Sequence, residues 1–419
     1  MVIAFCNWLK SSAVILFFMI LPVAAKSGLI FYQFAPLCEV LSDSSDPNTA
    51  VFLSHLKKSV SIIAPVNFIE NIAEHPTATT DYLMTIEIDN RKNLLTLNLC
   101  HLYQDSSQNT QCHHRAGLSK KYIFKNQSDL LGIANQWGDL LIEHMLGFKG
   151  SLSYPLAYVE NSSEQYQIII SDMAMDLHTT LYQSTSPIIS LNWSPDAYYL
   201  AFIELSNSGP ILKIMNIQTQ NIHSLEGFKY ISSPSFSKDG HCLYYIAEQS
   251  GFNQLMQYNM ENHKHEVLTL SKDWLVDVNA GWDDYHLILS IDRTGSTQIY
   301  EFNLLNKKFK RLTFTEEECI KGILSDANSS LFYSLLTKSH SLLMRRSFID
   351  HQTHYVTIEG HAEGVTAPPN PHIICFERNS DAQGKRTIVF KSLLDGRETL
   401  FDSDKDCYNP CWCPQPGLI

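Results

Sequence analysis

The chain of 419 residues has little positive charge, and it has no long hydrophobic run after its first 25 residues. Its 31 Lys and Arg residues are outnumbered by 43 Asp and Glu residues, which gives a formal net charge of −12. Nucleic-acid phosphates and anionic lipid headgroups both bind basic surfaces, so neither is an expected partner. Without an apolar run of about 20 residues, the rest of the chain is not expected to cross a membrane as a helix.

Enzyme signatures are also missing from the sequence. It has no Gly-x-Ser-x-Gly nucleophile elbow and no Gly-x-x-x-x-Gly-Lys-Ser/Thr phosphate loop. His265-Glu266 lacks a second histidine at the metalloprotease spacing. We therefore expect a protein that is not an enzyme, with no catalytic residue, no cofactor and no metal site.

The first 25 residues have the pattern of a secretory signal peptide. Lys10 precedes the apolar run Ala13–Leu21, and Val23-Ala24-Ala25 then places small residues at the two positions that a signal peptidase reads. We expect cleavage between Ala25 and Lys26. A retained N-terminal anchor is the alternative, and the small residues favour cleavage. The mature protein is then expected on the far side of the membrane.

The cysteine content does not define a disulfide scaffold. Loss of Cys6 with the signal peptide leaves nine of the ten cysteines, and an odd number leaves at least one thiol unpaired. Zinc bound by Cys100-His101 and Cys112-His113-His114 is an alternative, but the gap between them is not a standard ligand spacing. An exported protein can form bridges. The candidate bridges are Cys100 with Cys112, and two of Cys407, Cys411 and Cys413.

A repeat of about 44 residues fills the chain after residue 150. In one register, equivalent apolar residues open a strand in each of six units: Leu156, Leu200, Leu243, Leu287, Leu331 and Ile373. In a second register, short polar residues that can start a turn follow a later strand: Asp172, Asn216, Asn259, Asn303, Ser347 and Ser392. Because both sets of residues recur at nearly the same interval through six units, they indicate a genuine repeat.

Each unit contains four short extended runs, which is typical of a β-propeller blade. Helical repeats of similar length would show a periodicity of 3.6 residues, which is absent. The fragment Asn409–Pro414 supplies the inner strand that the first unit lacks, so the C-terminus is expected to close the ring. The expected inner-strand positions are Trp193, Phe236, Ala280, Leu324, Thr366 and Trp412. Ala197 stands where the turn of the third unit has Gly240, so a left-handed turn is awkward there.

Residues 26–148 lack the repeat and have the pattern of a small α/β domain. The expected elements are a strand at Leu29–Phe34, a helix at Thr49–Ser59, a hairpin of Tyr82–Ile88 with Leu94–Leu99, a strand within Gln111–Gly117, and a helix at Asp129–Leu146 capped by Ser128 and ended by Gly147. The expected fold is mainly β, a six-bladed propeller preceded by this domain. The domains are residues 1–25 (signal peptide), 26–148 (α/β domain) and 149–419 (propeller).

Four segments carry a resemblance to a known family. They are His144-Met-Leu-Gly-Phe-Lys-Gly150, Leu156-Ala-Tyr-Val159, Asn192-Trp-Ser-Pro-Asp196 and Ser233-Pro-Ser-Phe-Ser-Lys-Asp-Gly240. With the signal peptide and the C-terminal half-blade, they make the chain similar to the TolB family over nearly its whole mature length.

The resemblance implies a monomeric, non-enzymatic protein of the periplasm, in the Tol–Pal system that supports outer-membrane integrity and constriction at cell division. It implies that the propeller binds the lipoprotein Pal, and that an N-terminal segment binds the inner-membrane protein TolA. Only Lys26-Ser-Gly28 precede the expected strand at Leu29, so the chain departs from the family at the TolA segment.

The resemblance also implies that Pal docks at one mouth of the propeller, on the loops that enter the inner strands. By register these loops are Ser186–Ser190, Lys229–Ser232, Asp273–Asp277, Glu316–Cys319, His361–Gly364 and Asp406–Asn409. The candidate contact residues are Tyr230, Ile231, Asp273, Trp274, Asp277, Glu318, Glu363 and Asp406.

Tyr230 stands where the family has a partner-contacting histidine, and Tyr230 and Trp274 are the candidate aromatic anchors. Aromatic packing between blades is the alternative for both residues. A glycan-binding propeller that uses Trp274, Asp273 and Asp277 is the alternative function. A lyase with scattered channel residues is the remaining one.

Overall fold

The computed structural model describes residues 36–42, 46–64, 66–71, 81–104, 110–112, 117–162, 165–269, 273–293, 295–325, 329–358, 360–368, 372–379, 384–401 and 403–417. The expected signal peptide, the cleavage site between Ala25 and Lys26 and the expected strand at Leu29–Phe34 lie outside these residues. Within them, neither helix is both long and apolar enough to span a bilayer.

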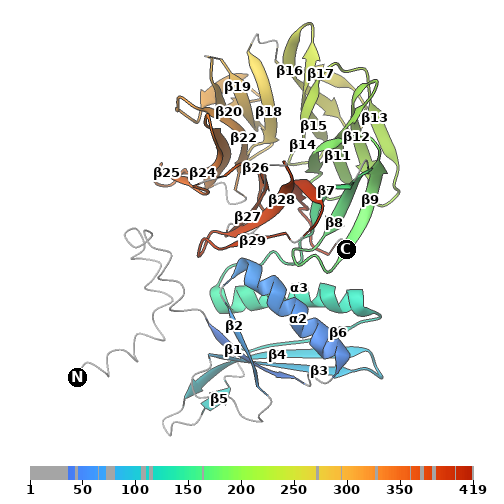
Figure 1. Ribbon diagram of the computed structural model, residues 1–419, viewed down its shortest axis with the longest axis vertical. Coiled ribbons are helices and arrows are strands. Elements are labelled where there is room, and N and C mark those ends of the chain that lie inside the picture. The colour runs from blue at the N-terminus through green and yellow to red at the C-terminus, as the bar shows by residue number, and fades with distance from the viewer. Residues whose placement is uncertain are drawn as a thin grey trace, which may run out of the picture.

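The N-terminal region contains a mixed sheet on the side that faces away from the rest of the chain (Figure 1). Its strand order is β2-β1-β3-β4-β5, and β6 also pairs with β4. The strands are β1 (Leu37–Ser42), β2 (Asn67–Asn71), β3 (Tyr82–Asp89), β4 (Leu94–Gln104), β5 (Thr110–Cys112) and β6 (Leu118–Ile123). The expected hairpin is confirmed as β3 and β4. The sequence did not predict β6, and of the strand expected within Gln111–Gly117 only Gln111 and Cys112 belong to β5.

Two helices lie between this sheet and the propeller (Figure 1). Helix α2 (Pro47–Ile63) contains the expected Thr49–Ser59 helix and starts earlier, because the Asp46 side chain accepts a hydrogen bond from the Thr49 N–H at 2.8 Å. Helix α3 (Gln127–Leu146) ends at Gly147, whose φ of 79° is left-handed as expected.

The expected N-cap of α3, Ser128, is wrong by two residues. Asn126 caps the helix and accepts a hydrogen bond from the Asp129 N–H at 2.9 Å. The Asp129 carboxylate reaches back and accepts from the Lys125 N–H at 2.7 Å. This reciprocal pair satisfies two backbone donors, so the helix begins at Gln127 and takes Ser128 into its first turn.

One apolar core joins the helices to the propeller. Phe52 and Leu56 of α2 and Trp137 of α3 belong to the same buried cluster as Leu156 and Trp412 of the propeller. The inner face of α3 includes Leu130, Ala134, Trp137 and Leu141, which are fully buried. The two regions therefore do not form separate cores.

The rest of the described chain forms six four-stranded sheets, here called blades 1 to 6, as the six repeats predict. Each blade is given from its innermost strand outward. Blade 1 is β30 (Asp406–Trp412), β7 (Leu156–Ser162), β8 (Gln165–Ser171) and β9 (His178–Ser184). Blade 2 is β10 (Ile188–Trp193), β11 (Tyr199–Ser206), β12 (Gly209–Asn216) and β13 (Ile222–Leu225). Blade 3 is β14 (Ile231–Phe236), β15 (Cys242–Gln249), β16 (Phe252–Asn259) and β17 (His265–Val267).

The remaining blades follow the same plan. Blade 4 is β18 (Trp274–Ala280), β19 (His286–Asp292), β20 (Thr297–Asn303) and β21 (Lys308–Arg311). Blade 5 is β22 (Glu318–Leu324), β23 (Ser330–Leu336), β24 (Ser341–Ser347) and β25 (Thr353–Tyr355). Blade 6 is β26 (Ala362–Thr366), β27 (Ile373–Asn379), β28 (Arg386–Ser392) and β29 (Glu398–Leu400). The innermost strands of neighbouring blades contact one another around the ring.

The ring is closed by the C-terminal strand, as predicted. Strand β30 pairs antiparallel with β7, with Trp412 opposite Leu156 and Cys411 opposite Ala157. This pairing completes blade 1 from two segments at opposite ends of the repeat region, and it covers the edge that β7 would otherwise expose.

The turn chemistry of the repeat is confirmed. The Ser237 hydroxyl donates to Asp239 at 2.6 Å in the first turn of blade 3. Asn259 accepts hydrogen bonds from the Glu261 and Asn262 N–H groups in a later turn of the same blade. Ala197 has a φ of 59°, the awkward left-handed conformation that the sequence indicated.

The cysteine expectations are confirmed in part and wrong in part. Cys100 is disulfide-bonded, and its expected partner Cys112 lies on the adjacent strand β5, where its side chain is outside the described residues. Cys407, Cys411 and Cys413 are all free thiols, so no bridge forms among them. Cys407 is buried in the cluster shared with the helices, whereas Cys413 is buried between blades 1 and 2. Their side chains therefore lie in different cores.

Candidate functional site

The two ends of the propeller differ in what covers them. The innermost strands all begin at one end, here called the mouth, and the turns that follow the third strands lie at the other end, here called the base. Base turns contact α2: Asp176 of blade 1 binds His55 and Lys58, and the Ser392 hydroxyl of blade 6 donates to the Ile63 carbonyl at 3.1 Å. The helices thus lie at the base, and the mouth faces away from them.

Exposed aromatic side chains line the mouth of blades 3 and 4, and three of them lie close together along the chain's turns. Trp274 is 55% exposed, Phe252 is 40% exposed and Tyr230 is 37% exposed. The Glu248 N–H donates to the Tyr230 carbonyl at 3.0 Å, and the Asn253 side chain donates to the Leu275 carbonyl at 3.2 Å. The turn between β15 and β16 therefore lies between the other two aromatic residues and presents Phe252.

Phe252 was not among the residues predicted from the sequence. The predicted contacts came only from the loops that enter the inner strands, whereas Phe252 opens the third strand of its blade, directly after the turn between the second and third strands. That turn also reaches the mouth, because alternate turns of an up-and-down sheet lie at the same end. An aromatic residue beside such a turn was the available signal.

Two of the predicted contact residues are buried. Ile231 is 3% exposed and packs in the core between blades 2 and 3, so Tyr230 and not Ile231 faces solvent. Asp277 is 8% exposed, and burial raises the pKa of its carboxyl group, although the Asn279 side chain donates to it at 2.9 Å. The Asp277 side chain is therefore not presented to solvent at the mouth.

A charge cluster surrounds Lys321 on the innermost strand of blade 5. Its ammonium nitrogen lies 3.4 Å from Glu363 Oε2 and 4.0 Å from Glu377 Oε1. Burial alone would lower the pKa of Lys321, but Glu377, Glu363 and Asp277 together raise it. Lys321 is thus held in its charged form by the neighbouring acidic side chains. The structure brings Glu363 and Asp277 near this lysine, which was not predicted from the sequence.

The other predicted acidic residues at the mouth differ in their surroundings. Asp273 binds the Arg293 guanidinium at 2.7 Å, and Asp406 binds Arg386 at 2.6 Å. The Arg386 guanidinium also lies over the Tyr408 ring, 3.4 Å from its centre. Glu318 is exposed at the start of β22. The Arg293 bridge therefore holds Asp273 against its own blade, and the Arg386 bridge ties Asp406 of blade 1 to blade 6. Glu318 faces solvent.

The innermost strand of every blade is irregular near the mouth. The pairing register shifts in each, and five shifts contain a residue with a left-handed φ between 50° and 62°: Ser190, Ser233, Lys321, Gly364 and Asn409. Such bulges redirect side chains and are enriched near functional sites. Only Gly364 and Asn409 are residue types that favour this conformation, so the pattern could not be predicted from the residue types at the other three positions.

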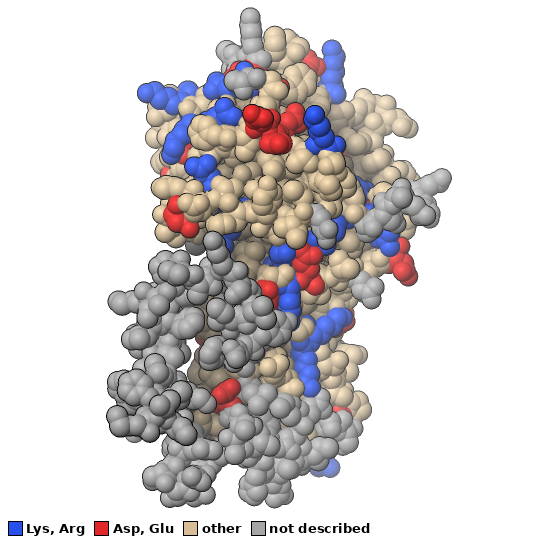
Figure 2. Space-filling model, turned by 60° about the vertical axis from the view of Figure 1, so that its left-hand side comes forward, with Lys and Arg blue, Asp and Glu red and all other residues tan. Residues whose placement is uncertain are grey.

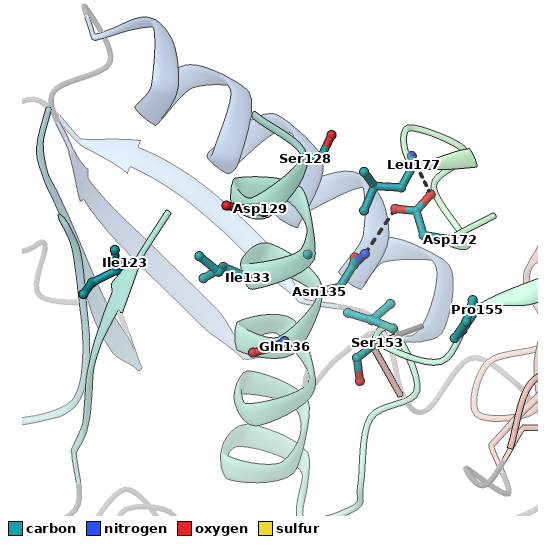
Figure 3. A pocket seen from close by; sticks show the side chains of 13 residues that line it. Ile123, Ser128, Asp129, Ile133, Asn135, Gln136, Ser153, Pro155, Asp172 and Leu177 are labelled. Atoms are coloured by element: carbon teal, nitrogen blue, oxygen red, sulfur yellow. Dashed lines mark hydrogen bonds between the residues drawn. The ribbon is translucent and has the colours of Figure 1, made fainter. Parts of the chain in front are cut away.

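A buried histidine joins the helices to blade 1. His55 Nδ1 lies 2.7 Å from Asp176 Oδ2, and His55 Nε2 lies 3.1 Å from Asp172 Oδ2. Asn135 of α3 donates to Asp172 at 3.1 Å, as Figure 3 shows. Carboxylate oxygens only accept, so both ring nitrogens must carry hydrogen and the imidazole is charged. Burial lowers the pKa of His55, but hydrogen bonds and charges of the two aspartates outweigh it and raise the pKa.

A cavity of about 440 Å³ lies beside this junction, between α3 and blade 1 (Figure 3). Its wall includes Gln136 and Gly132 of α3, Leu177 of the base turn and Pro155 of the linker.

Acidic and basic side chains are interspersed over the propeller face in Figure 2, so charge alone does not mark a site there.

These features define a class of protein: a β-propeller closed by its C-terminal strand, with a small α/β domain packed on its base and an aromatic mouth facing away. A family model described as TolB beta propeller domain matches residues 142–416. The chain belongs to this TolB β-propeller family.

Curated relatives carry the name Tol-Pal system protein TolB. The protein of Chromobacterium violaceum is 32% identical over 97 residues, which is 23% of this chain and 23% of that protein. The protein of Bordetella pertussis is 27% identical over 191 residues, or 42% of this chain and 41% of that protein. The aligned segments thus span less than half the length of these relatives.

Solved structures support the fold over a longer stretch. The crystal structure of TolB from Acinetobacter baumannii superposes with a TM-score of 0.75 and covers 91% of this chain and 97% of that chain, at 19% identity. A putative TolB from Agrobacterium tumefaciens covers 61% of this chain with a TM-score of 0.50 at 13% identity. At these identities the similarity shows the fold alone.

Proposed function

We propose that this protein is an exported, non-enzymatic scaffold of the periplasmic Tol–Pal system, and that its propeller mouth binds the lipoprotein Pal. The proposal includes cleavage after Ala25 and a role in outer-membrane integrity and constriction at division. The family membership and the names of the curated relatives support the system.

One observation supports the mouth as the binding surface: the exposed aromatic group of Tyr230, Phe252 and Trp274 faces away from the helices. Aromatic side chains are enriched among the residues that dominate binding energy. The base of blades 1 and 6 is already covered by the helices, so a large partner meets less obstruction at the mouth.

Calorimetric titration of the purified protein with the periplasmic domain of its host's own Pal tests the proposal. We expect saturable one-to-one binding that the double variant Tyr230→Ala/Trp274→Ala weakens at least about tenfold, since anchor truncations often cost 2 kcal/mol or more. The control is Tyr198→Ala/Tyr285→Ala, which removes two exposed tyrosines from turns at the base. Absence of binding by the folded protein at high micromolar Pal would overturn the partner, and equal loss in both double variants would overturn the site.

The glycan-binding alternative has less support. It used Asp273 and Asp277 beside Trp274, but Asp273 is engaged by Arg293 and Asp277 is buried. Titration with peptidoglycan fragments in the absence of Pal tests it separately. Binding of TolA by the N-terminal segment is tested separately, by a pull-down with the periplasmic domain of TolA. The segment before β1 lies outside the described residues.

A further inference from the structure

Three histidines surround one tyrosine at the base of blades 2 and 3. The His223 ring of β13 stacks on the Tyr258 ring, with centres 5.7 Å apart and planes 22° apart. The rings of His263 and His265 lie 5.9 Å and 5.0 Å from the Tyr258 ring. All three histidines are exposed, whereas Tyr258 is buried. The group therefore presents imidazoles to solvent on a rigid support contributed by two blades.

Tyrosine hydroxyls orient two of these rings. Tyr258 Oη lies 2.6 Å from His263 Nδ1, and Tyr245 Oη lies 2.7 Å from His265 Nδ1. Within the described residues, His263 Nε2 and both ring nitrogens of His223 have no hydrogen-bond partner. A cavity of about 290 Å³ opens beside them and is lined by both histidines. A polar contact behind the ring thus directs the free nitrogen of His263, as in histidines that bind metals, whereas stacking on Tyr258 holds the His223 ring.

The spacing of His223 and His263 suits one metal ion. Their ring centres are 5.4 Å apart. Two imidazoles that share a tetrahedral ion at about 2.0–2.1 Å from each nitrogen would place their ring centres roughly 5.2 Å apart. Within the described part of the chain, no three His, Cys, Asp or Glu side chains are grouped to hold an ion. The pair would therefore leave further coordination positions to water or to a partner's ligand.

We propose that His223 and His263 form a two-histidine site for a divalent transition-metal ion such as Zn²⁺, with Tyr258 as the positioning residue. Imidazole nitrogen is a favoured ligand of zinc, copper and nickel. An ion held here ties the outer strand of blade 2 to the β16–β17 turn of blade 3.

Zinc titration of the full protein, prepared without a histidine tag, tests the proposal by calorimetry. We expect one saturable site at micromolar zinc. His223→Gln or His263→Asn should weaken it at least about tenfold, and Tyr258→Phe should weaken it by about tenfold while keeping the ring in place, because loss of a supporting hydrogen bond typically costs 10–100-fold. Asn is chosen at position 263 because its φ of 60° is left-handed.

The matched control is His351→Asn. His351 occupies the same position of the equivalent turn in blade 5, with a φ of 59°. We expect it to bind zinc like the unaltered protein. Absence of saturable binding at 100-fold excess zinc would overturn the proposal, and so would unchanged binding in the double variant of His223 and His263.

Discussion

The side chain of Asp139 occupies the space that any side chain at Gly150 would need. Asp139 on α3 accepts hydrogen bonds from the Leu152 N–H at 2.7 Å and the Ser153 N–H at 3.0 Å. Burial raises the pKa of this carboxyl group despite these donors. A Cβ atom at Gly150 would overlap the carboxylate and lie 2.5 Å from the Asp139 Cα. The linker can therefore follow α3 this closely only because residue 150 is glycine.

Gly150→Ala is expected to lower the free energy of unfolding by about 2–3 kcal/mol, since the added methyl meets backbone as well as side chain. Gly132→Ala is the control: it lies in the same helix-linker unit, and an added Cβ meets nothing within 4 Å. That change should stabilise the protein by about 0.8 kcal/mol, because alanine favours helix. Urea unfolding measures both, and equal effects of the two variants would refute the packing argument.

His55→Gln is expected to destabilise the protein more at pH 6 than at pH 9. The folded state raises the pKa of His55, so its contribution is fully present below about pH 6.5 and is lost as the pH rises through the folded pKa. At pH 6 the loss should be about 3 kcal/mol, because Asp172 keeps a buried charge without its partner.

Urea unfolding of both proteins at the two pH values measures the difference. His178→Gln, which changes an exposed histidine on β9, should show no pH-dependent loss. A penalty for His55→Gln that is the same at pH 6 and pH 9 would contradict the charged bridge.

Trp412→Ala is expected to cost about 4 kcal/mol of unfolding free energy. Trp412 is buried where β30 closes blade 1, its ring lies 5.8 Å from Phe390, and its indole N–H donates to the Tyr154 carbonyl at 3.2 Å. Trp274→Ala removes the same side chain at the mouth and should change stability by less than about 0.5 kcal/mol. Thermal denaturation in which the Trp274 variant melts as early as the Trp412 variant would contradict this assignment.

Gly240→Ala is expected to cost about 1 kcal/mol, because Gly240 has a φ of 75°. The nearest atom to an added Cβ is Pro195 Cδ at 3.6 Å, an ordinary contact, so the loss comes from the backbone conformation. Gly240→Asn should cost less, since asparagine tolerates this conformation. Chemical denaturation measures the free energy of unfolding of both variants. If the Gly240→Asn variant were less stable than the Gly240→Ala variant, packing, and not backbone strain, would decide the effect.

The repeat could be predicted from the sequence because equivalent turns need the same type of residue. Asn216, Asn259 and Asn303 each accept hydrogen bonds from the backbone two and three residues on, so each turn needs a short polar residue at the same place. Buried strands between the turns supply the apolar register. Closure by β30 could be predicted from the same repeat. The first unit lacks an inner strand, and one additional strand follows the last unit.

Other features had no comparable signal. Strand β6 presents Lys120 and Lys121 to solvent, so its sequence lacks the alternation that predicts a strand. Ile231 stands beside Tyr230 in the sequence, and only the register of β14 decides that one is buried and the other exposed. Lys321 of blade 5 lies near Asp277 of blade 4 and Glu363 of blade 6, and no spacing in one sequence predicts such a meeting.

The closing strand also sets the order in which the propeller can fold. Strand β7 appears early in the chain, and its inner partner β30 is among the last residues described. Until β30 arrives, the edge of β7 is open to pairing with other chains, and long-range pairing of this kind is slow. A chain made from its N-terminus must therefore keep its first blade incomplete until β30 has emerged, and until then the open edge of β7 is a place where protection from aggregation matters.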